Sequence, residues 1–167
     1  LFLQLFLFYN IRLLHFFSIS SMVFVACGLN HQTAPIQVRE KVALHPAAQD
    51  SLLNNLLQIP EVNEAALLST CNRTEIYCDT LQPNILMEWL AQEHKLSQDS
   101  LKPYFYIHEG HQGIKHTLRV ASGLDSMMIG EPQILGKMKQ AYQQACRLGG
   151  VKTQLRPVFE YIFNASK

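Results

Sequence analysis

Residues 64–79, EAALLSTCNRTEIYCD, predict two β-strands joined by a short connection. The first segment, Glu64–Ser69, contains a continuous apolar run, which is typical of a buried strand. The second segment, Glu75–Asp79, alternates apolar and polar side chains, as expected for a strand with two different faces. Between them, Thr70–Arg73 places a cysteine beside hydroxyl, amide and guanidinium groups. The sequence therefore predicts two strands with reactive side chains between them.

Cys71 is the candidate nucleophile of this connection. A thiol beside a fixed cation is shifted toward thiolate, which is the nucleophilic form. Residues at strand ends, where the backbone leaves the sheet, are well placed to meet a substrate. A lone cysteine near an arginine is more often a small hydrophobe beside a solvated side chain. The choice between these interpretations depends on the rest of the chain.

The order of the predicted elements indicates the fold class. Strands are also expected at residues 23–29 and 104–107, and helices at residues 37–43, 47–58, 84–95, 112–121, 132–148 and 153–167. The order strand, helix, strand, strand, helix, strand matches the split βαβ–βαβ arrangement. We therefore predict an α+β, ferredoxin-like βαβ-βαβ sandwich followed by helices that lead into a long linking helix.

Two of the predicted helices carry more specific expectations. Asn84 is expected to cap the helix at residues 84–95, because asparagine is a favoured N-cap residue. In the helix at residues 112–121, Ile114, Leu118 and Ala121 are expected on the apolar side.

Composition limits the function classes. The 167 residues carry a formal net charge of +1, so contact with nucleic acid would need a local basic patch rather than an overall basic field. The 4 cysteines show no Cys-x-x-Cys or Cys/His metal spacing, and no metal site is predicted. A reduced, cytoplasmic protein is the simplest interpretation.

Residues 1–21 need separate treatment. The segment is rich in Leu and Phe, contains Arg12 and His15, and precedes the first methionine, Met22. It has neither a basic leader nor a small-residue cleavage site, so it is a poor signal peptide. We interpret it as upstream read-through or a disordered extension, with residues 22–167 forming the domain. A membrane anchor, and with it a membrane-tethered interaction protein, is the alternative.

Three runs together resemble one known family. They are GLNHQTAP at residues 28–35, LSTCNRTE at 68–75, and RVASGLDS at 119–126, which leads to GEPQILG at 130–136. In this order and spacing they are similar to the N-terminal catalytic domain of glutamyl-tRNA reductase, and the likeness extends over residues 22–167.

This resemblance implies an activity. The family reduces glutamyl-tRNA(Glu) with NADPH to glutamate-1-semialdehyde through a cysteine thioester, the first step of tetrapyrrole (porphyrin and haem) biosynthesis by the five-carbon pathway. The family's NADPH-binding and dimerisation domains are not expected in this chain, which has no Gly-x-Gly-x-x-Gly run. The resemblance further implies a homodimer at full length and glutamate-1-semialdehyde aminomutase as a partner. We expect these residues to form the thioester but not to reduce it.

The resemblance also assigns site residues. The implied catalytic residues are Cys71 as nucleophile and His116, as a general acid or base or as a ligand of the ester carbonyl. The implied substrate contacts are Thr70, Asn72, Arg73, Ser126, Glu131, Pro132, Gln133 and Lys137, the last at a position where the family normally has glutamine. Arg73 has two candidate roles, pairing with a substrate carboxylate or lowering the thiol pKa. Glu131 is the expected partner of the substrate ammonium.

One further interpretation of the same domain stays open. A non-catalytic module that binds tRNA or a protein partner would keep the fold of the reductase without its chemistry. Selective labelling of Cys71 over the other thiols would support the catalytic domain, and its absence would support the non-catalytic module.

Overall fold

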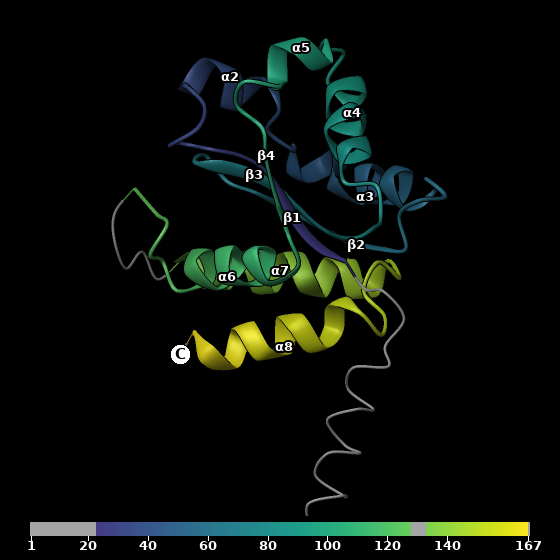
Figure 1. The fold of residues 1–167 in the computed structure, drawn as a ribbon, viewed down its shortest axis with the longest axis vertical. Helices are drawn as coiled ribbons and strands as arrows, with labels where there is room; N and C mark the ends of the chain where they lie inside the picture. Colours follow the sequence, from purple (N-terminus) through teal and green to yellow (C-terminus); the bar gives the residue numbers. More distant parts are fainter. Residues whose placement is uncertain (1–22, 128–132, 167) are drawn as a thin grey trace, which may run out of the picture.

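The computed structural model describes residues 23–127 and 133–166, which form one antiparallel sheet covered by helices (Figure 1). The sheet order is β2-β3-β1-β4. The strands are β1 (Phe24–Asn30), β2 (Glu64–Ser69), β3 (Arg73–Asp79) and β4 (Tyr106–Glu109). The helices are α2 (Ile36–Lys41), η1 (Pro46–Ala48), α3 (Gln49–Leu57), α4 (Asn84–Glu93), α5 (Gln98–Leu101), α6 (Gly110–Ala121), α7 (Gln133–Arg147) and α8 (Leu155–Ala165). This order confirms the predicted α+β, ferredoxin-like arrangement.

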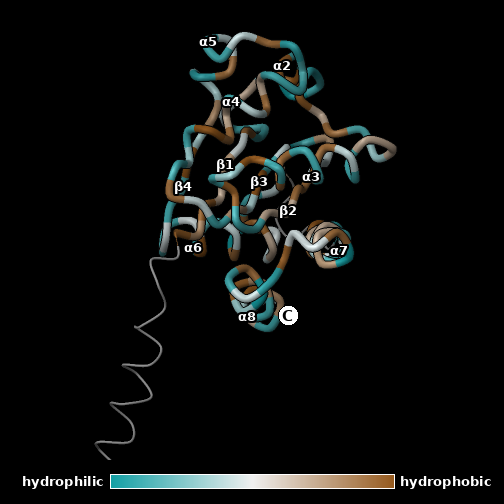
Figure 2. The backbone as a smooth tube through the Cα atoms, turned by 90° about the vertical axis from the view of Figure 1, so that its right-hand side faces the viewer, coloured by the Kyte–Doolittle hydropathy of each residue, from teal (hydrophilic) through white to brown (hydrophobic). Residues whose placement is uncertain are grey.

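The helices form layers on the two sides of the sheet. α3 and α4 lie on one side, whereas α6 and α7 cover the other (Figure 1). α8 packs beneath α6 and α7, as the turned view makes clear (Figure 2). It also reaches the sheet, because the rings of Tyr77 on β3 and Phe159 on α8 meet edge to face at 5.6 Å. The side of the sheet that bears Tyr77 therefore has helices packed against it.

A buried carboxylate fixes the start of α8. Glu64, at the first position of β2, is 3% exposed and accepts backbone N–H groups from Lys152 at 2.8 Å, Gln154 at 2.9 Å and Leu155 at 2.9 Å. These donors belong to the beginning of a helix, where N–H groups lack partners within the helix and negative charge is favourable. Glu64 thus ties the α7–α8 connection to the edge of the sheet.

The starts of β3 and β4 each lie two residues away from the sequence prediction, and one helix cap differs as well. β3 begins at Arg73 rather than Glu75, because the turn after β2 is tight and Thr70 N donates to Arg73 O at 2.8 Å. β4 begins at Tyr106 rather than Tyr104, whose N–H instead donates to Leu101 O in the turn after α5. The prediction that Asn84 caps α4 is wrong, since Pro83 occupies the N-cap position and makes no side-chain cap bond.

The predicted apolar side of α6 packs against the hydrophobic core, but it is not the most deeply buried side of the helix. Ile114 and Leu118 are only half-buried, and the side facing the sheet is formed by Gly113, Thr117, Val120 and Ala121. The packing explains the difference. A Cβ atom at Gly113 would lie 2.7 Å from His108 O and 3.0 Å from the Phe24 ring, so the helix packs closely only because glycine has no side chain. Ala121 was correctly predicted.

Candidate active site

Cys71 lies exposed in the turn between β2 and β3. Ser69 pairs with Thr74 at the end of the ladder, so the turn is short. Thr70 Oγ1 accepts the Asn72 N–H at 3.1 Å, a local bond typical of threonine in turns. Asn72 O in turn accepts the N–H of His31 at 2.9 Å. The thiol is therefore carried by a turn that is bonded to the loop after β1.

A small pocket beside this turn brings together most of the predicted substrate contacts. Its lining residues are Thr70, Cys71, Asn72, Arg73, Ser126, Ile134 and Lys137. Three separate parts of the chain supply them: the β2–β3 turn, the segment after α6 and the first turns of α7. Gln133 is exposed and does not line the pocket, and Glu131 and Pro132 lie outside the described residues.

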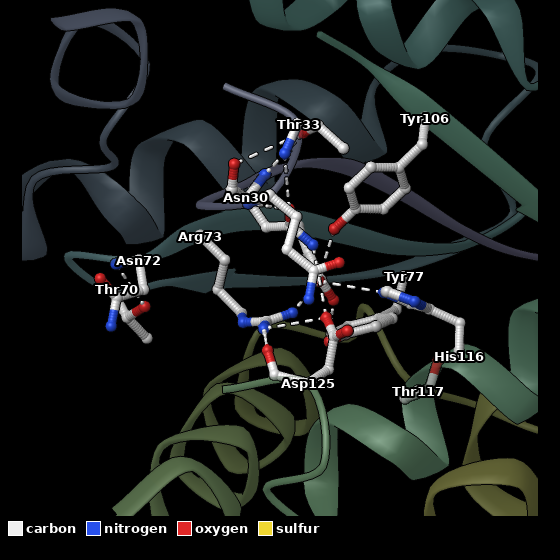
Figure 3. A network of polar contacts seen from close by, with 12 residues as sticks. Asn30, Thr33, Thr70, Asn72, Arg73, Tyr77, Tyr106, His116, Thr117 and Asp125 are labelled. Atoms are coloured by element: carbon white, nitrogen blue, oxygen red, sulfur yellow. Dashed lines mark hydrogen bonds and ion pairs between the residues drawn. The ribbon is translucent and has the colours of Figure 1, made fainter. Parts of the chain in front are cut away.

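Arg73 points under the sheet and is only 2% exposed. Its Nη1 donates to Glu75 Oε1 at 2.5 Å, and its Nη2 donates to Asp125 Oδ2 at 3.1 Å and to the Asp125 carbonyl (Figure 3). Burial disfavours the guanidinium charge, but Glu75 and the nearby tyrosines outweigh burial and raise the pKa of Arg73. Both ends of the guanidinium fork are therefore occupied by groups of this chain.

Glu75 is the centre of the network. Besides Arg73, it accepts the hydroxyl of Tyr77 at 2.5 Å and that of Tyr106 at 2.6 Å, and His116 Nε2 lies 3.1 Å from its Oε1. Burial alone would raise the pKa of Glu75, but the bond to His116 and the charge of Arg73 lower it to about 2. Glu75 is thus a carboxylate that stays charged although it is fully buried.

The strand register explains how these side chains meet. Glu75 on β3 pairs with Gly28 on β1, and Gly28 pairs with Tyr106 on β4, so the three positions form one row across the sheet. Gly28 has φ 149°, and a Cβ atom there would lie 2.1 Å from Thr74 O. Because Gly28 has no side chain, the Tyr106 hydroxyl can reach Glu75 across β1. The same face carries Arg73, two residues before Glu75.

His116 joins the network from α6. It contacts Glu75, and its ring lies 5.2 Å from the ring of Tyr106 and 4.7 Å from that of His108. Among the described residues it is not part of the lining of the Cys71 pocket; it lines a groove on the other side of the Arg73–Asp125 pair. Its implied role as an acid or base stays a prediction.

Tyr106 and Asp125 belong to the site but were not predicted from the sequence, and Glu75 had no predicted role. One signal was available for Glu75. Polar residues alternate from Arg73 through Glu75 to Tyr77, so one face of β3 is polar although both faces are buried. A buried polar face needs partners, which predicts that polar groups from elsewhere cover it. No pattern along the chain indicates which residues these are.

The described residues do not fit a dinucleotide cofactor or a metal. Rossmann-type NADPH sites use a parallel βαβ unit with a glycine-rich turn, whereas the sheet here is antiparallel throughout. Within residues 23–127 and 133–166, no group of three or more His, Cys, Asp or Glu side chains could hold a metal ion. In the same residues, no helix has both the length and the apolar character needed to cross a membrane.

Comparison with known proteins identifies the family. The family described as "Glutamyl-tRNAGlu reductase, N-terminal domain" matches residues 27–167. A glutamyl-tRNA reductase of Legionella pneumophila (strain Corby) is 79% identical over 146 residues, covering 87% of this chain and 34% of the relative. One from Pseudomonas putida (strain F1) is 47% identical over 148 residues, covering 87% of this chain and 35% of the relative.

A solved structure agrees with the sequence matches. The structure described as glutamyl-tRNA reductase from Methanopyrus kandleri superposes with a TM-score of 0.71 at 29% identity, covering 84% of this chain and 32% of that one. The chain thus spans about a third of the length of the relatives that it matches. The chain belongs to the glutamyl-tRNAGlu reductase N-terminal domain family.

Proposed function

We propose that this chain is the part of a glutamyl-tRNA reductase that receives the glutamyl group from glutamyl-tRNA(Glu) on Cys71. The observation that carries the proposal is the pocket in which an exposed cysteine adjoins Thr70, Asn72, Arg73, Ser126 and Lys137. These are hydroxyl, amide and cationic groups, which suit an amino-acid ester with a free carboxylate. Family membership and the names of the relatives support the same activity.

The proposed step is transfer of an acyl group from oxygen to sulfur. The Cys71 thiolate attacks the ester carbonyl carbon, the S–C bond forms, and the C–O bond to the tRNA ribose breaks. The released ribose oxygen takes up the proton that the thiol gave up. The products are a glutamyl thioester on Cys71 and uncharged tRNA. Covalent catalysis divides one difficult reaction into two easier ones, and the thioester is the better hydride acceptor.

Arg73 is proposed to recognise the glutamate side-chain carboxylate, with an exchange of partners. Its Nη1 pairs with Glu75 at 2.5 Å and its Nη2 with the Asp125 carboxylate at 3.1 Å, so the Asp125 carboxylate is the weaker of the two charged partners. The bond from Nη2 to the Asp125 carbonyl can stay in place. Asp125 also adjoins Ser126, which lines the pocket. A substrate carboxylate would replace the Asp125 carboxylate while the Arg73–Glu75 pair stays intact. Charge-assisted bonds of this kind are directional and strong.

The remaining roles are proposed from the family resemblance. Glu131 would pair with the substrate ammonium, and Pro132 and Gln133 would complete the contacts. NADPH would supply hydride for the second half of the reaction, and no reducing step is assigned to the described residues. A homodimer, the aminomutase partner and a cytoplasmic location also stay proposals.

Mass spectrometry after incubation with glutamyl-tRNA tests the proposal. The chain is mixed with tRNA charged with isotopically labelled glutamate, quenched in acid and digested. We expect the label on the peptide that contains Cys71, with release of uncharged tRNA. Cys71→Ala should abolish both, whereas Cys146→Ala, which removes a half-buried cysteine elsewhere, should change neither. Label on Cys146, or tRNA deacylation that persists in Cys71→Ala, would contradict the proposal.

A further inference from the structure

The groove that His116 lines has a wall made by one side of α6. Gln112, Lys115, His116 and Arg119 line it, at helical spacings of three and four residues. Residues at these spacings share one side of a helix, and the opposite side of α6 is buried against the sheet. We call this cavity the α6 groove. It holds about 440 Å³, which is within the range of ligand sites.

The other walls of the α6 groove supply flat rings and neutral polar groups. Tyr106 and His108 line it from β4, with ring centroids 5.1 Å apart and an interplanar angle of 29°. Gln32 and Thr33 line it from the loop after β1, and both are exposed. Nucleotides are bound by such groups, since bases stack on aromatic and histidine rings and riboses bond to amides and hydroxyls.

The charges of the α6 groove favour an anion. Lys115 and Arg119 are exposed and, among the described residues, neither forms an ion pair. Within the same part of the chain, Asp125 is the only carboxylate that lines the groove. Its Oδ2 already accepts from Arg73 at 3.1 Å and from Asn30 at 3.3 Å. Within the described residues, the groove therefore presents two cations that form no ion pair and a carboxylate whose charge is compensated by Arg73.

The α6 groove and the Cys71 pocket are neighbours. Asp125 lines the groove, Ser126 lines the pocket, and Arg73 lines the pocket while bonding to Asp125. The loop after β1 also connects them, because Gln32 lines the groove and His31 bonds to Asn72. One buried ion pair thus separates the two sites.

We propose that the α6 groove binds the 3′-terminal nucleotides of the tRNA, which places the ester over the Arg73–Asp125 pair and the glutamyl group in the Cys71 pocket. Lys115 and Arg119 contact backbone phosphates, and the rings of Tyr106 and His108 receive a base. This inference rests on the proposed function, because the ligand is taken to be the leaving group of the acyl transfer. The net charge of +1 makes a local basic site necessary for such a ligand.

The test measures binding of an uncharged acceptor-stem RNA that ends in single-stranded CCA, by fluorescence anisotropy over a range of salt. For Lys115→Ala/Arg119→Ala we expect Kd to rise about tenfold. The slope of log K against log salt should fall by about 1.4, because two single-strand phosphate contacts are lost. Lys115→Arg/Arg119→Lys should keep most of the affinity. The matched control Lys102→Ala/Arg156→Ala removes two exposed cations that do not line the groove, and should bind as the unchanged chain does.

A second measurement separates this inference from the proposed function. Acylation of Cys71 by a glutamyl thioester that carries no nucleotide should proceed equally in the unchanged chain and in Lys115→Ala/Arg119→Ala. If neither glutamyl-tRNA nor this small donor acylates Cys71, yet RNA binding still depends on the two cations, the proposed function fails and the groove assignment stands. Equal RNA binding by the groove variant and the control would overturn the assignment. So would displacement of the RNA by NADPH at lower concentration than by the free trinucleotide CCA, since the groove would then be a dinucleotide site.

Discussion

Two buried carboxylates, Glu64 and Glu75, lie on the same face of the β2–β3 pair but have partners of different kinds. Glu64 accepts backbone N–H groups at the start of α8, whereas Glu75 accepts side-chain donors from Arg73, Tyr77, Tyr106 and His116. Backbone N–H donors do not depend on side-chain identity, so the hydrogen bonds of Glu64 depend only on the backbone path of the α7–α8 connection. Glu75 depends on the identity of every partner, and one of these lines the Cys71 pocket. Glu64 anchors the start of α8 to the sheet, whereas Glu75 couples the fold to the site.

The largest effect is expected from Glu75→Ala. This change leaves Arg73 buried with one carboxylate partner and leaves two tyrosine hydroxyls without acceptors. Removing one partner of a buried pair costs about 3–5 kcal/mol of unfolding free energy. Urea unfolding followed by circular dichroism measures the loss. Glu88→Ala, on the exposed side of α4, should cost less than about 0.5 kcal/mol. A loss below about 1 kcal/mol for Glu75→Ala would mean that the network is not a strong stabiliser.

Acid should reduce the contribution of Glu75. Its pKa is about 2 in the folded protein against a usual value of 4.5, so the folded state binds fewer protons between these values. The stabilisation is complete above about pH 4.5 and is lost as the pH falls toward 2, with a total of about 3 kcal/mol. Urea midpoints of the unchanged chain and of Glu75→Gln, compared from neutral to acid pH, should converge. A difference that stays constant with pH would show that the Glu75 charge is not what stabilises the fold.

Glu64→Gln should have a smaller and more local effect. The amide keeps one acceptor but turns an NH₂ group toward backbone donors, which we expect to cost about 1–3 kcal/mol. Hydrogen exchange should become faster at Lys152, Gln154 and Leu155, whose N–H groups Glu64 accepts. The control Glu160→Gln lies exposed on α8 itself and should leave these amides protected. Equal exchange in both variants would show that Glu64 does not anchor the helix.

The smallest effect is expected from Asp125→Asn. The amide can keep the bond to Arg73 but loses its charge, so about 1 kcal/mol of unfolding free energy should be lost. The positive charge of Arg73, which lines the same pocket as Cys71, is then less compensated, and a cationic environment makes a cysteine more reactive. Alkylation of Cys71 by iodoacetamide at neutral pH should become about threefold faster. Glu64→Gln should leave the alkylation rate unchanged. An equal change in Asp125→Asn and Glu64→Gln would show that the network around Arg73 affects Cys71 no more than Glu64 does.

The sequence was sufficient for the element order but not for the polar network. Strand and helix patterns are local, so β2 and the Cys71 turn could be predicted from neighbouring residues along the chain. The sheet topology followed from matching the order of the elements to the split βαβ–βαβ arrangement. The contacts of Glu75 join residues up to 41 positions apart, and that of Arg73 with Asp125 spans 52. Such contacts are determined by strand register and helix packing, and neither can be predicted from local hydrophobicity patterns.

The predictions for α6 and α4 were limited for the same reason. Hydrophobicity correctly placed Ile114 and Leu118 against the core, but it did not show that the side of α6 that meets β1 and β4 most closely carries Gly113. Likewise, Asn84 is a favoured capping residue, but the chain enters α4 one residue earlier, at Pro83. In both cases, tertiary geometry decided what a correct local preference could not.

The pairing of Ser69 with Thr74 limits which sequence changes evolution can accept in this part of the protein. Successive side chains of a strand point to opposite faces, so adding or deleting a single residue between Ser69 and Thr74 would turn β3 over if the strand kept its place in the sheet. Ile76 and Cys78 would then replace Glu75 and Tyr77 on the side facing α6. Loops of most proteins tolerate changes in length. In the connection between Ser69 and Thr74 we expect related proteins to differ by substitutions only, since an insertion or deletion would separate Arg73 and Glu75 from their partners.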